Sequence, residues 1–79
     1  MKPGFSSWLS SNKGFTGAAA KDVACRLRRA SSFCDFDWEA SADSNVFSLG
    51  RSENFQSLTV SVKSQLRRSV KLYGEFLKS

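Results

Sequence analysis

The side chains best placed for chemistry in this sequence are cations repeated at helical spacing near its C-terminus. Lys63, Arg67 and Lys71 follow one another at intervals of four residues. Arg68 lies beside them, and Lys78 comes one heptad after Lys71. Residues four apart lie on one side of a helix. Such a row of cations is suited to binding phosphates, whose dense charge makes Lys and Arg contacts the main source of affinity for nucleic acid.

A second group of cations falls where a helix is expected over residues 17–34. Opposite its apolar side, this helix would carry Lys21, Cys25, Arg28 and Ser32, with Arg26 and Arg29 at the flank. Asp22 precedes Arg26 by four residues, the favourable order for an ion pair. We expect the cations of the two helices to face one way and to form a single phosphate-binding surface.

Several kinds of chemistry lack the residues they need. The sequence contains no His, the usual general base near neutral pH and the commonest metal ligand. We therefore expect no enzyme, no metal or other cofactor, and no small-molecule substrate. Cys25 and Cys34 would lie about 13 Å apart in one continuous helix, which is too far for a disulfide. Reduced thiols suit a cytoplasmic protein, and Cys25 among cations is an alternative candidate for a reactive thiol.

Charge is distributed unevenly along the 79 residues, which carry a net charge of +5. Residues 1–34 have six basic and one acidic side chain, residues 35–57 one basic and five acidic, and residues 58–79 five basic and one acidic. Basic ends indicate an acidic partner such as nucleic acid. The acidic middle could instead neutralise the cations internally. No apolar run has the length of a membrane span, and we expect a soluble protein with no membrane partner.

The apolar spacing predicts an all-α fold, a single helical domain over residues 1–79 with four to five helices. We expect helices over residues 5–11, 17–34, 43–49 and 60–77, with a further turn near 53–57. Their predicted N-caps are Thr16, then Asp43 or Ser44, then Thr59 or Ser61. The two long helices have apolar stripes, Ala20, Val23, Leu27, Ala30 and Cys34 in one, and Val62, Leu66, Val70, Tyr73 and Leu77 in the other. The Tyr73 ring should be buried, with its hydroxyl at the edge of the core.

Three segments together resemble a known family. They are Phe-Ser-Ser-Trp-Leu at residues 5–9, the helix opened by Thr16, and Ser-Gln-Leu-Arg-Arg-Ser-Val at 64–70 running into Tyr-Gly-Glu-Phe-Leu at 73–77. This pattern is similar to the N-terminal SAM-like (core-binding) domain of phage integrases and other tyrosine recombinases. The family has Thr and Tyr where this chain has Ala19 and Val23.

The resemblance implies a helical bundle that clamps one face of duplex DNA, while a separate C-terminal domain performs strand cleavage. No such domain follows Ser79, so we expect DNA binding without chemistry. The DNA-facing residues implied by position are Lys13, Thr16, Lys21, Arg28, Lys63, Gln65, Arg67 and Lys71. Most would contact phosphates, and Gln65 or Arg68 would read a base edge.

Two other functions fit the same sequence. In the first, the chain is a protein-interaction module whose cations meet an acidic protein surface, with Leu72 as an exposed apolar anchor. In the second, the chain binds RNA, and Phe36 and Trp38 in the acidic middle stack on bases.

Overall fold

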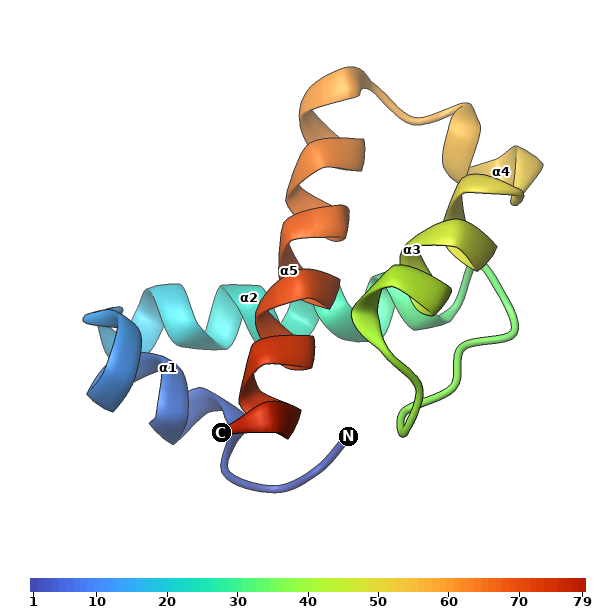
Figure 1. Ribbon diagram of the computed structural model, residues 1–79. Coiled ribbons are helices and arrows are strands. Elements are labelled where there is room, and N and C mark those ends of the chain that lie inside the picture. The colour runs from blue at the N-terminus through green and yellow to red at the C-terminus, as the bar shows by residue number, and fades with distance from the viewer.

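The computed structural model describes residues 1–79 and contains five helices and no strands (Figure 1). The helices are α1 (Phe5–Lys13), α2 (Gly17–Ser31), α3 (Ala42–Gly50), α4 (Glu53–Gln56) and α5 (Val60–Lys78). With 71% of the chain helical, the predicted all-α class is confirmed. No helix combines the length and the apolar character needed to cross a membrane.

Hydroxyl side chains open four of the five helices. Thr16, Ser41, Ser52 and Thr59 each accept a hydrogen bond from the backbone N–H three residues later. These bonds satisfy amides that have no partner within the first turn of a helix. Thr16 and Thr59 were predicted as caps. The prediction of Asp43 or Ser44 as the N-cap of α3 was wrong, because this helix begins one residue earlier than expected and Asp43 lies in its first turn.

The ends of α1 and α2 differ from the prediction in opposite directions. α1 continues to Lys13 and ends where Gly14 adopts φ 69°, a left-handed conformation that glycine tolerates without strain. α2 ends at Ser31 rather than residue 34. The hydroxyls of Ser31 and Ser32 donate to the carbonyls of Arg28 and Arg29 at 2.6 Å, which provides those carbonyls with partners outside the helical ladder.

Helix α5 crosses α2, with α1 on one side of α5 and α3 on the other (Figure 1). The core between them receives residues from every helix, including Phe5 of α1, Leu27 of α2, Leu49 of α3 and Phe55 of α4. From α5 it receives Leu66, Val70, Tyr73 and Phe76. Because three helices contact α5, more than its predicted apolar stripe is covered, and Ser69 and Gly74 are buried as well.

Tyr73 joins three parts of the chain around this core. Its ring meets Phe5 of α1 edge-on at 5.3 Å between centroids and Trp38 of the α2–α3 connector edge-on at 5.6 Å. Its hydroxyl accepts a hydrogen bond from the Lys2 backbone N–H at 2.9 Å. The ring is 3% exposed, so the predicted buried ring with a hydroxyl at the edge of the core is confirmed.

Gly74 marks the closest approach of two helices. A Cβ atom at this position would lie 2.6 Å from the Cβ of Ala42, at the start of α3. Carbon atoms do not approach this closely without displacement of their backbones. The absence of a side chain at Gly74 therefore sets the spacing between α3 and α5.

We expect Gly74→Ala to lower the free energy of unfolding by about 1–3 kcal/mol, because relief of the clash separates α3 from α5. The measurement is urea unfolding followed by circular dichroism. Gly17→Ala is the matched control, since a Cβ there meets nothing within 4 Å. Adding Ala42→Gly to Gly74→Ala should recover part of the loss; no recovery would contradict the proposed contact.

Leu66→Ala should cost about 2–5 kcal/mol, because Leu66 lies in the middle of the core where a cavity cannot easily collapse. Leu72 is half-buried, so Leu72→Ala should cost less in the same unfolding experiment. Equal losses would show that the core is centred on a different side of α5.

Candidate nucleic-acid interface

One side of α5 faces solvent along the whole helix. The exposed face of α5 consists of Val60, Ser61, Ser64, Gln65, Arg68, Lys71, Glu75 and Lys78. It combines cations with hydroxyl and amide groups, and from Val60 to Gly74 the helix contains no acidic residue. Of the predicted binding residues, Gln65, Arg68 and Lys71 lie on this face.

Lys63 and Arg67 lie at the edge of that face rather than at its centre. Both are half-buried and both contact α4 or its C-terminal end. The Arg67 guanidinium lies over the Phe55 ring at 5.7 Å from its centroid, and Lys63 donates to the side-chain oxygen of Gln56 at 3.4 Å. Stacking on an aromatic ring fixes a guanidinium while leaving its N–H groups free to donate.

The turn between α1 and α2 lies alongside the opposite edge. The Arg68 guanidinium is over the ring of Phe15 at 5.4 Å, and Lys13 forms an ion pair with Glu75 at 3.0 Å. This pair is the sole ion pair in the structure. The structure thus brings Lys13 next to α5, although the charge of Lys13 is compensated by Glu75. Thr16 is exposed at the end of this turn, where it caps α2.

The predicted cations of α2 lie on a different side of the molecule. Lys21 and Arg28 are exposed. Helix α5 crosses α2 (Figure 1), and the buried side of each helix packs against the other, so their exposed sides point away from one another. Arg28 borders a hollow of about 240 Å³ with the N-terminal segment and α1. The expected single surface formed by both helices is therefore wrong, and the expected Asp22–Arg26 ion pair is not formed.

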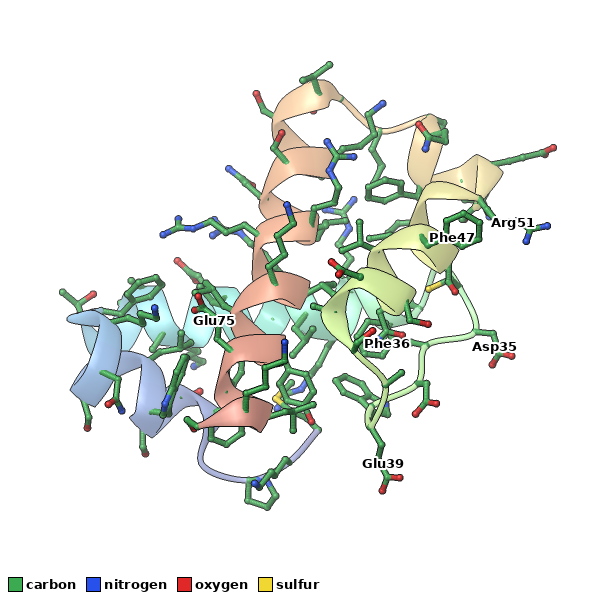
Figure 2. All side chains as sticks on the ribbon, in the orientation of Figure 1. Asp35, Phe36, Glu39, Phe47, Arg51 and Glu75 are labelled. Carbon is green, nitrogen blue, oxygen red and sulfur yellow. The ribbon has the colours of Figure 1, made fainter.

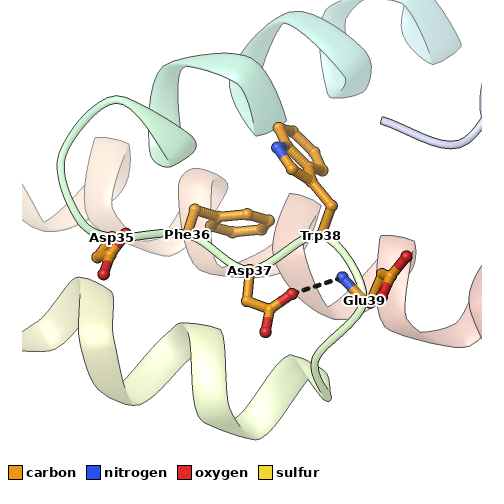
Figure 3. A pocket seen from close by; sticks show the side chains of 5 residues that line it. All are labelled: Asp35, Phe36, Asp37, Trp38 and Glu39. Atoms are coloured by element: carbon orange, nitrogen blue, oxygen red, sulfur yellow. Dashed lines mark hydrogen bonds between the residues drawn. The ribbon is translucent and has the colours of Figure 1, made fainter.

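Three of the five acidic residues of the middle segment, Asp35, Asp37 and Glu39, lie in the connector between α2 and α3, beside a shallow hollow of about 480 Å³ (Figure 3). Phe36 and Trp38 project to one side and pack against the core, and the carboxylates of Asp35 and Asp37 project to the other. The rings are half-buried and their surroundings are anionic, which opposes RNA stacking. None of these carboxylates pairs with a cation, so internal neutralisation by ion pairs is also excluded.

Asn45 fixes the position of this connector by hydrogen bonds, a role that was not predicted from the sequence. Its side chain is almost fully buried, accepts from the Asp37 N–H at 3.1 Å and donates to the Asp37 carbonyl at 2.8 Å. The sequence feature that could have indicated this role is the position of a polar residue among Ala42, Val46 and Leu49, on the buried side of α3. A buried amide there requires a backbone partner.

The two cysteines occupy different environments. Cys25 is exposed on α2, whereas Cys34 lies beyond the end of α2 and is half-buried, so the prediction that both belong to one helix is wrong. Both thiols are free in the structure. Burial raises the pKa of the Cys34 thiol above its ordinary value, and the neighbouring charge of Asp35 raises this pKa further.

Leu72 does not provide an exposed anchor for a partner. It is half-buried and packs against the core, because the helices on either side of α5 cover more of it than α2 alone would. The exposed large apolar residues are instead Met1, Phe47 and Val60.

Comparison of the chain with protein-family models, with curated proteins and with solved structures found no match. No group of three or more His, Cys, Asp or Glu residues is placed to hold a metal ion.

Alkylation should distinguish the two thiols. We expect Cys25 to react with iodoacetamide near pH 8 much faster than Cys34, because a raised pKa leaves less thiolate and burial restricts access. Peptide mass spectrometry measures both rates. Asp35→Asn should accelerate Cys34 modestly and leave Cys25 unchanged, since the charge is the smaller cause of the shift. An intramolecular disulfide in the folded protein would contradict this assignment.

Proposed function

We propose that this chain binds duplex DNA through the exposed face of α5 and performs no chemistry on it. The observation that carries the proposal is the composition of that face, on which Arg68, Lys71 and Lys78 accompany Ser61, Ser64 and Gln65. The one carboxylate of α5, that of Glu75, is compensated by Lys13. Cations supply affinity for phosphates, and hydroxyl and amide groups can reach base edges.

The shape of the molecule supports the same assignment. The first turns of α5 extend beyond α2 (Figure 1), and the major groove of B-DNA admits an α-helix. In this arrangement Gln65 faces the bases. Arg68, whose guanidinium lies over the Phe15 ring, is beside Gln65 on this face, and Lys71 and Lys78 reach phosphates.

The distribution of charge favours one orientation on DNA. The labelled acidic side chains Asp35 and Glu39 lie toward the connector and away from the first turns of α5 (Figure 2). A polyanion is attracted to the cations of α5 and repelled by the connector. The proposal includes the recombinase-type reading of the sequence, in which a separate catalytic domain of a mobile-element or phage protein would cut the DNA.

A salt titration with matched variants tests the proposal. If three to five cations of α5 each neutralise a phosphate, the slope of log K against log salt should lie between about −2.7 and −4.5. The double variant Arg68→Ala/Lys71→Ala should weaken binding roughly 10- to 100-fold near 0.1 M salt and reduce the slope by about two. The measurement is fluorescence anisotropy with a labelled duplex.

The double variant Lys21→Ala/Arg28→Ala removes the same charge from α2 and should have a much smaller effect, and Arg51→Ala should change little. Equal effects of the α5 and α2 variants would show attraction by net charge alone. If the unaltered chain does not bind duplex DNA even at low salt, the proposal is wrong, and acidic protein surfaces become the partner to test.

A further inference from the structure

Phe47 is an exposed aromatic ring with no role in the surface described above. Its side chain, labelled on α3 in Figure 2, is 66% exposed. The other aromatic rings of the chain are buried or half-buried. A large apolar ring is less favourable in water than in a core. Within the fold this ring does not pack against the core.

Charges of opposite sign lie on either side of Phe47 along the helix. Asp43 is four residues before it and Arg51 four residues after it, so the three side chains form one ridge on the side of α3 opposite the core. The Arg51 guanidinium lies over the Phe47 ring at 5.7 Å from its centroid. Neither Asp43 nor Arg51 has an ion-pair partner within the chain. We name this set the α3 ridge.

We propose that the α3 ridge is a docking surface for a second copy of this chain, with the two α3 helices antiparallel about a two-fold axis at Phe47. In this arrangement the two Phe47 rings pack against each other. Asp43 and Arg51 are about 12 Å apart along the helix, so each Asp43 lies opposite the Arg51 of the other copy. Parallel helices would place like charges together.

The residues beside the ridge allow close approach. Ser44 and Gly50 flank Phe47 on the exposed side of α3 and leave space for a second ring. An isologous contact requires a self-complementary surface, and a ridge with an acid, a central ring and a base meets that requirement. The α3 ridge shares no residue with the exposed face of α5, so self-association is independent of the proposed DNA binding.

Two helices of nine residues bury less area than a standard interface of about 800 Å² per partner, so the dimer should be weak. Sedimentation equilibrium without DNA, at concentrations up to about 1 mM, is the appropriate measurement. A reducing agent prevents cross-linking through the exposed Cys25. Phe47→Ala should lower the association constant at least about tenfold. Val60→Ala is the matched control, because Val60 is 74% exposed and lies outside the ridge.

The charge pairing has its own test. Asp43→Arg and Arg51→Asp should each weaken self-association, because each places like charges opposite one another. An equimolar mixture of the two variants should restore the dimer, since opposite charges then meet at both ends. Glu53→Arg is the control for net charge. Because Asp43 lies in the first turn of α3, circular dichroism of each variant verifies that the helix remains folded.

Three results would overturn the proposal. They are a monomer at every concentration, a dimer that Phe47→Ala leaves unchanged, and a mixture of charge variants that associates no better than its components. Assemblies larger than a dimer would exclude the two-fold arrangement.

Discussion

The close packing of the C-terminal half of α5 is the constraint on which the rest of the structure depends. Tyr73 contacts α1 and the α2–α3 connector with its ring and the N-terminal segment with its hydroxyl. Gly74, the next residue, lets α3 approach. One helix turn thus fixes the positions of segments from both ends and the middle of the sequence. A domain of this size has a small core and a low free energy of unfolding, so these contacts contribute a large share of its stability.

Burial of this half of α5 determines what the other side of the helix can do. Since α1, α2 and α3 occupy its apolar side, the polar side is free along its whole length. The same packing prevents α2 from sharing that surface, because the two helices face each other through the core. The proposed binding surface is therefore built from one helix and the turn beside it, rather than from two basic helices.

Local sequence rules were sufficient for most of the secondary structure. Periodic apolar spacing predicted the long helices, and the Thr16 and Thr59 hydroxyls were recognisable as caps because their bonds are made within one turn. The end of α2 could not be predicted in this way. Ser31 and Ser32 bond the carbonyls of Arg28 and Arg29 only where the chain leaves the helix. The Ser41 cap was not predicted, although its bond to the Ser44 N–H is equally local, because Asp43 and Ser44 offered competing caps nearby.

The site shows the same division between local and long-range information. That Arg68 and Lys71 are exposed follows from their positions on the helix. Two other contacts depend on which helices meet, and no local sequence pattern predicts them. They are the ion pair of Lys13 with Glu75 and the stacking of Arg67 on Phe55. Leu72 illustrates the point most simply: a residue off the apolar stripe was expected in solvent, and the arrival of further helices beside α5 covered it.

Unpaired charges are the feature that the two proposed surfaces, the exposed face of α5 and the α3 ridge, have in common. Of the charged side chains, only Lys13 and Glu75 form an ion pair, so the acidic connector and the basic helices do not compensate each other by direct contact. Surface ion pairs contribute little to stability, and a fold gains little by forming them. Charges left unpaired remain available to partners outside the chain. On α5 they are of one sign, which suits a polyanion, whereas on α3 an acid and a base flank an exposed ring, which suits a copy of the same surface.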